Sequence, residues 1–161
     1  ILRKSLIMKI DIRQATLSDI PAVAGDLLEA GIQDLDHAGY QPVLTMAYDV
    51  MNDESYLAAT EDGKPICMFG ISDTGCIWLH MTNEVQKYPI AFIRAAKRFI
   101  NKLERPILFN CIDIQNTNLI KFIKHLGFKV INVVAVEPSN NYHVEIVKLW
   151  HGWPPSRQVP G

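Results

Sequence analysis

The sequence predicts an α/β domain of the mixed (α+β) type, with a mostly antiparallel sheet of seven strands flanked by four helices. Two observations carry this prediction. Residues 107–128 contain an apolar run followed at once by a helical stripe, and residues 56–82 contain three short apolar runs separated by polar turns at 62–65 and 73–75. A helix between strands predicts layered packing, whereas the closely spaced runs predict an antiparallel meander.

The clearest local signal is the predicted helix that begins at Asn116. Asparagine has a short polar side chain that accepts hydrogen bonds at a helix start, and Gly127 supplies the left-handed conformation that often ends a helix. Apolar residues between them recur at spacings of three and four, which predicts one buried face. These residues are Leu119, Phe122, Ile123 and Leu126, and Lys121, Lys124 and His125 fall on the opposite face.

The other elements follow in chain order. We expect a strand at 9–15, one helix from Ile20 to Ile32 capped by Thr16 or Ser18, and a second helix from Pro42 to about Met51. Three strands at 56–61, 66–72 and 76–82 precede a helix at 90–103. After the strand at 107–114 and the Asn116 helix come strands at 129–137 and 142–150, joined by a turn at 138–141. The resulting order is β-α-α-β-β-β-α-β-α-β-β.

The chain of 161 residues suits one domain with a substantial core, which we place at residues 8–150. Residues 1–7 are too short for a signal peptide and precede Met8, so we set them aside as a non-native or disordered leader. Three prolines predict an irregular tail at 151–161. No apolar run approaches the roughly 18 residues of a membrane span, so no membrane partner is expected.

The cysteines, Cys67, Cys76 and Cys111, are odd in number and scattered among apolar, strand-like segments. None has a histidine nearby at metal-ligand spacing, so we expect buried free thiols and no metal site. Because free thiols are typical of a reducing compartment, the expected location is cytoplasmic.

Charge is unevenly distributed although the net charge is only −1. Between residues 11 and 62 eleven acidic residues accompany a single base, Arg13, whereas between Lys87 and Arg105 six basic residues accompany only Glu104. The basic segment would attract an anionic ligand such as a phosphorylated cofactor, or it is simply a solvated helix face. The near-zero net charge argues against nucleic acid as a partner.

With this order of elements, the chain resembles the GNAT superfamily of acyl-coenzyme A N-acyltransferases over about residues 8–150. Residues 12–16 with Asp19 and Ile20 are similar to the first strand and helix entry of that family. The segment from Asn116 to Phe128 is similar to its asparagine-to-LGF segment. The amino-acid sequences of this segment and of the strand CIWLHMT before a Lys- and Arg-rich helix look most like those of small GNAT-like proteins of tailed phages. These include an internal virion protein of short-tailed coliphages.

The resemblance implies acetyl-coenzyme A (acetyl-CoA) as cofactor. In typical members the strand matching residues 77–82 splays from its neighbour and pairs with the pantetheine arm, which makes Leu79, Met81 and Thr82 the implied contacts. Asn116 would touch the cofactor in addition to capping its helix.

The resemblance also implies that the next loop, residues 83–89, wraps the pyrophosphate at a helix N-terminus. This loop lacks the two glycines of the family pattern, and Pro89 removes one backbone donor. Lys87 and Arg94 would supply compensating positive charge.

Acetyl transfer to an amine, the implied activity, needs a base for the amine proton and an acid for the departing thiolate. His80 and Glu84 are the available bases near the expected cleft, and Tyr88 is a substitute acid. Ile123 stands where many family members have a tyrosine acid. The acidic N-terminal third borders the acceptor cleft in this family, which implies a cationic acceptor.

Two functions therefore stay open. The first is an N-acetyltransferase acting on a small amine or a protein amine. The second is a catalytically silent GNAT-fold phage virion or assembly protein, which has kept the scaffold and lost the glycine loop and the tyrosine. The second would add virion proteins as partners and the virion as a location, and a homo-oligomer is possible under both.

Overall fold

The computed structural model describes residues 8–136 and 141–150, and its strands follow one another along the chain as predicted. In these ranges the strands are β1 (Ile10–Gln14), β2 (Glu54–Thr60), β3 (Pro65–Ile71), β4 (Ile77–Met81), β5 (Ile107–Asp113), β6 (Lys129–Val136) and β7 (Asn141–Leu149). The α-helices are α2 (Ile20–Ala24), α3 (Glu29–His37), α4 (Pro42–Asn52), α5 (Pro89–Lys102) and α6 (Thr117–His125), with short 3-10 helices η1 (Leu17–Asp19) and η2 (Asn83–Lys87). The predicted leader, the predicted tail and residues 138–140 of the last predicted turn lie outside the described residues.

The strands form two antiparallel sheets, with orders β1-β2-β3-β4 and β5-β7-β6. The sheets meet near the starts of β4 and β5, at a parallel bridge between Cys76 and Phe109. The Phe109 N–H donates to the Gly75 carbonyl there at 3.0 Å. The mixed α+β class and the strand order are confirmed, but the expected single sheet is divided because β4 and β5 pair only at this point.

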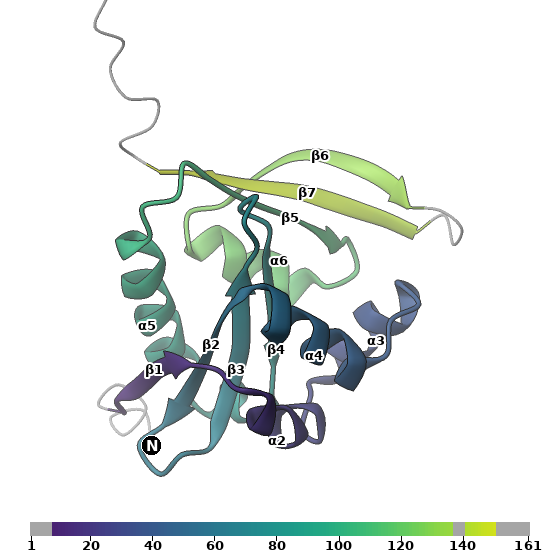
Figure 1. Cartoon of the computed structure of the whole chain (residues 1–161). Coiled ribbons are helices and arrows are strands. Elements are labelled where there is room, and N and C mark those ends of the chain that lie inside the picture. Colours follow the sequence, from purple (N-terminus) through teal and green to yellow (C-terminus); the bar gives the residue numbers. More distant parts are fainter. Residues whose placement is uncertain (1–7, 137–140, 151–161) are drawn as a thin grey trace, which may run out of the picture.

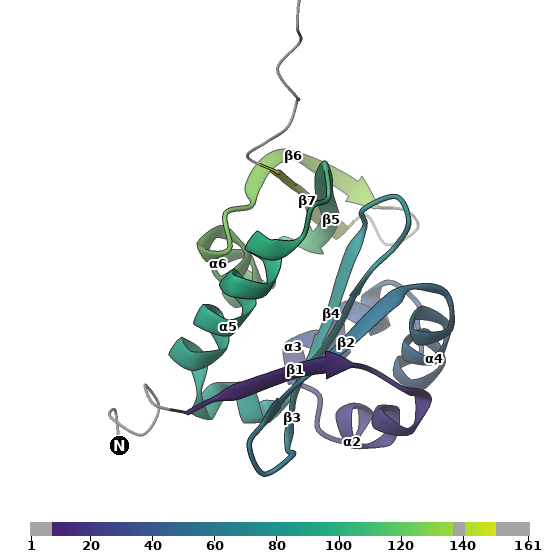
Figure 2. The ribbon, with the colours of Figure 1, turned by 60° about the vertical axis from the view of Figure 1, so that its left-hand side comes forward.

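Helices cover both faces of the four-stranded sheet. Figure 2 shows α5 and α6 on one side of it and α2, α3 and α4 on the other. Met46 and Met68 are buried between α4 and β3, whereas Phe92 of α5 packs in a core with Ile66. A third core joins α6 to β5 and β7, which lie across the top of the molecule in Figure 1. The region between the two sheets is therefore bordered by helices from both layers.

The single helix predicted from Ile20 to Ile32 is wrong, because α2 and α3 are separated by residues 25–28. The Leu28 N–H donates to the Met81 carbonyl at 3.0 Å, and the Asn83 N–H donates to the Asp26 carbonyl at 2.9 Å. Gly25 disfavours a continuous helix, and pairing with the end of β4 satisfies the backbone of this segment instead. Five α-helices in the described part of the chain thus replace the four expected.

The signals at the Asn116 helix are confirmed. Asn116 Oδ1 accepts a hydrogen bond from the Leu119 N–H at 3.2 Å, and Gly127 ends the helix with φ of 95°. Ile123 and Leu126 are buried in the predicted stripe. Local caps and periodicity were sufficient here because each acts within one or two helical turns.

All three cysteines are free thiols, as predicted, but only Cys67 is buried. Burial raises the pKa of the Cys67 thiol, which keeps it protonated and unreactive. Cys111 is exposed because alternate residues of a strand point to opposite faces, and the buried Leu108 and Ile112 take the covered face of β5.

Candidate functional site

Strand β4 leaves much of one edge unpaired. The Thr82 N–H donates to the Ile66 carbonyl at 2.9 Å, so the antiparallel register turns the backbone groups of every second residue away from β3. The N–H and C=O of Leu79 and the N–H of Met81 therefore point toward the β5 side. Within residues 8–136 and 141–150 no ladder or bridge pairs residues 79–81 of β4 with β5. An unpaired strand edge is a binding site for an extended ligand.

A cleft of about 920 Å³ opens beside this edge, bordered by β4, β5, β7, α3 and α4. Tyr40 and Tyr48 line it and are both largely exposed. Within the described ranges the lining holds four carboxylates and neither lysine nor arginine. The carboxylates belong to Asp34, Asp49, Asp53 and Asp113. The cleft is therefore negatively charged and favours a cationic ligand.

His80 is a largely covered titratable side chain that lines this cleft. Its side chain is 10% exposed, and its Nε2 lies 3.7 Å from Oδ2 of Asp49, which is too long for a hydrogen bond. Nε2 is buried without a hydrogen-bond partner among the described residues. A neutral imidazole nitrogen in this position can take a proton from a bound amine, with the carboxylate stabilising the resulting charge.

Trp78 fixes the wall next to His80. The two rings are 5.5 Å apart between centroids, and Trp78 Nε1 donates to Asp53 Oδ2 at 3.0 Å. The indole N–H is a neutral donor, so it holds the Asp53 carboxylate in place without offsetting its charge.

A second polar cluster closes the cleft where α3 meets β5. His37 Nδ1 lies 2.9 Å from Asp113 Oδ2, and Asn116 Nδ2 donates to Asp34 Oδ2 at 2.7 Å. The hydrogen bond with Asp113 raises the pKa of His37. Burial raises the pKa of Asp113, but the hydrogen bonds from His37 and from the Gln115 N–H, together with the charges of His37 and His143, outweigh it, so this pKa lies below its ordinary value. Burial raises the pKa of Asp34. These contacts fasten α3 to residues about eighty positions later in the chain.

Glu84 and Tyr88, the other predicted catalytic residues, lie outside the lining of this cleft. Glu84 is buried and pairs with Lys87, whose Nζ lies 3.1 Å from Oε2. This hydrogen bond raises the pKa of Lys87. Tyr88 joins η2 to α5 and packs against the core beneath α5. Of the three residues, the structure brings only His80 to the cleft.

In the loop before α5, several backbone N–H groups donate to acceptors of the same loop. The Glu84 N–H donates to Oγ1 of Thr82, the Val85 N–H to the Thr82 carbonyl, and the Tyr88 N–H to the Val85 carbonyl. Thr82 is buried, and its hydroxyl donates to the Pro65 carbonyl at 2.7 Å. The N–H groups still available to an anion are those in the first turn of α5.

The remaining predicted cofactor contacts are dispersed. Arg94 is exposed on α5, and Lys87 is neutralised by Glu84. Asn116 uses its side chain to cap α6 and to bind Asp34. Among the predicted contacts, Leu79 and the N–H of Met81 are thus the ones at the open edge of β4 that no strand pairs in the described part of the chain.

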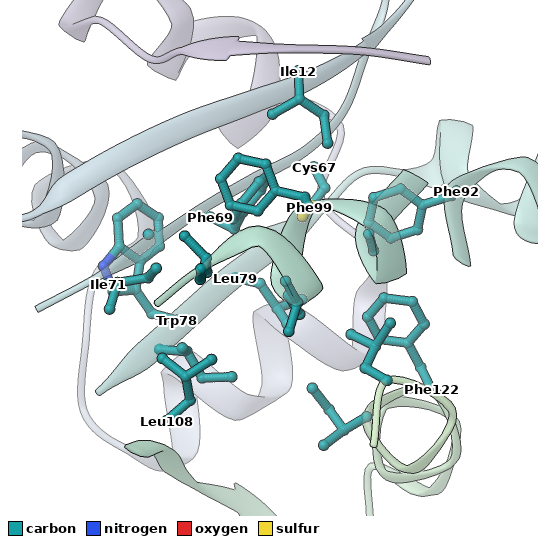
Figure 3. Close-up of a pocket in the computed structure, with 17 residues that line it drawn as sticks. Ile12, Cys67, Phe69, Ile71, Trp78, Leu79, Phe92, Phe99, Leu108 and Phe122 are labelled. Carbon is teal, nitrogen blue, oxygen red and sulfur yellow. The ribbon is translucent and has the colours of Figure 1, made fainter. Parts of the chain in front are cut away.

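A small apolar pocket of about 50 Å³ lies between β4, α5 and α6. Figure 3 shows Phe92 and Phe122 next to each other at one side of it, and the two rings are stacked with centroids 5.3 Å apart. Leu79 and Ile123 line both this pocket and the acidic cleft, so they form part of the wall between the two spaces. The side chains that line this pocket are mostly apolar, and an apolar surrounding strengthens electrostatic interactions at the nearby strand edge.

Comparison with solved structures identifies the architecture. Spermidine N-acetyltransferase from Vibrio cholerae in complex with CoA and spermine matches with a TM-score of 0.65 and 10% identity, covering 88% of this chain and 96% of that chain. A ribosomal-protein-S5-alanine acetyltransferase from Vibrio fischeri matches with a TM-score of 0.63 and 16% identity, covering 91% and 96%. A GCN5-related N-acetyltransferase from Kribbella flavida matches with a TM-score of 0.62 and 15% identity, covering 87% and 97%.

The chain has the GNAT fold. At these identities the likeness shows the fold alone. No family model matches the sequence, and no curated protein matches it. The link to tailed phages and the cytoplasmic location stay predictions. Among the described helices none is long and apolar enough to cross a membrane, and in the same residues no group of three or more His, Cys, Asp or Glu side chains is placed to hold a metal ion.

Sequence reasoning missed the carboxylates that share the cleft with His80. Asp34, Asp49 and Asp53 belong to the acidic region noted between residues 11 and 62, whereas Asp113 lies in an apolar strand. The excess of acids was a usable signal for a charged surface. It did not show which acids share a cleft, because they come from α3, the end of α4 and β5.

Proposed function

We propose that this protein is an N-acetyltransferase that moves an acetyl group from acetyl-CoA to an amine, with His80 as the general base. The observation that carries the proposal is the buried, unpartnered Nε2 of His80, which lines the cleft beside Asp49 and beside the free edge of β4 in the part of the chain that the structure describes. The GNAT fold supports the reaction class, and one matched structure is described as a spermidine N-acetyltransferase in complex with CoA and spermine.

The residues present fit the cofactor in part. The backbone groups of Leu79 and the N–H of Met81 at the open edge of β4 suit an extended amide-containing arm, because apolar side chains shield this edge. The first turn of α5, with Arg94 nearby, is the remaining place for phosphate groups, since several N–H groups of the loop before it already donate within that loop. Acetyl-CoA, when bound, supplies the thioester that is attacked.

This chain's residues then prepare the amine. An ammonium group entering the cleft binds next to Asp49, and one of its protons passes to Nε2 of His80. The amine nitrogen is left with a free electron pair for attack, and the Asp49 carboxylate stabilises the imidazolium. Asp49 therefore acts through His80 as a positioning residue.

Titration with acetyl-CoA in a calorimeter, followed by a turnover assay with a panel of amines, tests the proposal. We expect micromolar to submillimolar binding and measurable thiol release. His80→Ala should retain cofactor binding and lose turnover by about 10²-fold or more, as expected for loss of a general base. His125→Ala, at an exposed position of α6, is the matched control. Absence of heat and of any shift in Tm at millimolar cofactor would refute the proposal.

A specific observation favours a second candidate, a GNAT-fold protein without catalysis. The hydrogen bonds within the loop before α5, the neutralised Lys87 and the buried Ile123 all weaken the usual means of holding the cofactor and protonating the thiolate. The same titration decides between the candidates, because a silent protein would bind no acetyl-CoA and His80→Ala would change nothing but stability.

A further inference from the structure

We propose that the acceptor is a small polyamine, a linear molecule with several ammonium groups, rather than a singly charged amine. The inference deepens the proposed function and rests on it for the reaction. Its own support is the distribution of charge around the cleft, together with the His80 nitrogen that has no partner among the described residues and marks where the reacting nitrogen sits.

Negative charge is present at two separate places in the cleft. Asp49 and Asp53 lie at the end of α4, next to His80 and Trp78. Asp34, on α3, lies by contrast beside β5 and α6, where it accepts a hydrogen bond from Asn116.

In the described lining no lysine or arginine compensates these charges. The hydrogen-bond donors to Asp34 and Asp53 are a neutral amide and a neutral indole, so neither donor offsets the charge of its carboxylate. Of the four carboxylates of the described lining, Asp113 alone is hydrogen-bonded to a group that can be cationic, His37, while His80 lies 3.7 Å from Asp49 and His143 is the other histidine of the lining. Carboxylates at two places, in a described lining without lysine or arginine, match a ligand with more than one positive charge.

The outer wall suits the methylene spacers of such a ligand. Tyr40, Leu44 and Tyr48 line the cleft and are 61%, 67% and 67% exposed, respectively. Aromatic faces attract ammonium groups, and the same rings pack against CH₂ groups. The cleft therefore offers alternating contacts for charge and for hydrocarbon.

The buried Nε2 of His80 distinguishes this acidic surface from a merely solvated one. Its side chain is nine-tenths buried and lines the cleft, yet Nε2 has no hydrogen-bond partner in the described residues. A buried polar atom without a partner is destabilising unless a ligand or solvent completes it. One amine of the polyamine would bind between His80 and Asp49 and give Nε2 a hydrogen-bond partner, and a second amine would bind near Asp34.

Calorimetric titration of the full chain with spermidine and with butylamine, without cofactor, tests this inference independently of catalysis. We expect spermidine to bind at least about tenfold more tightly than butylamine, because each added ammonium meets a carboxylate. Asp34→Asn should weaken spermidine about fivefold to tenfold and leave butylamine nearly unchanged, whereas Asp53→Asn, beside His80, should weaken both amines. Both variants retain an oxygen that accepts the native hydrogen bond.

Asp36→Asn is the matched control, since it removes the same charge from an exposed position of α3 outside the cleft lining. Equal affinity for spermidine and butylamine would overturn the inference, as would an equal effect of Asp34→Asn and Asp36→Asn. Binding of a lysine-rich peptide without binding of spermidine would also overturn it, in favour of a protein acceptor. If acetyl-CoA fails to bind while spermidine behaves as expected, the proposed function falls and the polyamine site stands.

Discussion

The indole of Trp78 occupies the space that a side chain at Gly70 would need. A Cβ at position 70 would come within 2.6 Å of Cε2 of Trp78 and within 2.7 Å of the Glu54 carbonyl oxygen. The absence of a side chain on β3 thus lets Trp78 pack over it while Nε1 binds Asp53. One wall of the cleft depends on this glycine.

Gly70→Ala should therefore displace Trp78 and destabilise the protein by about 1–3 kcal/mol, the usual range for overpacking. Chemical denaturation followed by tryptophan fluorescence measures both effects. Gly31→Ala is the control, because a Cβ there meets nothing within 4 Å and glycine lies within α3. That change should stabilise by about 0.5–1 kcal/mol. Equal Tm values for the two variants would contradict this account of Gly70.

The pair of His37 and Asp113 predicts a pH-dependent contribution to stability. The raised pKa of His37 makes its contribution fully present below about pH 6.5, and that contribution is lost as pH rises through the raised pKa. The lowered pKa of Asp113 makes its contribution fully present above about pH 4, and that contribution is lost as pH falls through the lowered pKa.

Between these limits the pair stabilises the attachment of α3 to β5 most. The Tm difference between the wild type and His37→Gln should be largest near about pH 5 and should shrink by about pH 9. Thermal unfolding across this range is the measurement, with His125→Gln as an exposed histidine control. A difference that does not vary with pH would show that His37 acts only as a neutral hydrogen-bond partner.

Asn116 combines two roles that substitutions can separate. Asn116→Ala removes the cap of α6 and the donor to Asp34, so the free energy of unfolding should fall by about 1–2 kcal/mol. Asn116→Asp keeps a capping oxygen but places a carboxylate oxygen where the donor nitrogen lies, 2.7 Å from Oδ2 of Asp34. Its stability should be low near neutral pH and recover as the carboxylates protonate, which thermal unfolding between neutral and acidic pH measures. An Asn116→Asp variant as stable as the wild type at neutral pH would rule out the contact with Asp34.

Substitutions of Ile123 test how tightly the wall between the apolar pocket and the cleft is packed. It is 1% exposed, so Ile123→Ala should destabilise by about 2–4 kcal/mol through a cavity and Ile123→Val by about 1 kcal/mol. Denaturant unfolding of both variants measures how much each lowers the free energy of unfolding. Ile32→Val, at a position that is 46% exposed, should be nearly neutral. Similar values for Ile123→Ala and Ile32→Val would mean that this part of α6 is loosely packed.

The order of secondary-structure elements could be read from the sequence because its signals are local. Asn116, Gly127 and the stripe between them act over one or two turns, and the structure confirms them. The meander turns at 62–65 and 73–75 were readable for the same reason, with Gly63 and Gly75 at positive φ.

Signals failed where a distant partner decided the local structure. Residues 25–28 carry a helical apolar pattern, yet they pair with the end of β4, which lies more than fifty residues later. The division of the sheet is also a tertiary property, since it depends on how far β4 and β5 diverge after their bridge. Cys111 lies in an apolar strand, and only the position of α6 shows which of its faces is covered.

The sequence by itself determined the α+β class, the order of strands, the ends of α6 and the presence of an acidic N-terminal third. These features depend on neighbouring residues or on composition. Only the tertiary structure decided that His80 faces Asp49, that Glu84 and Tyr88 lie elsewhere, and that four carboxylates share one cleft. The physical reason is that a site gathers side chains from separate elements, and their distances depend on packing that no local pattern records.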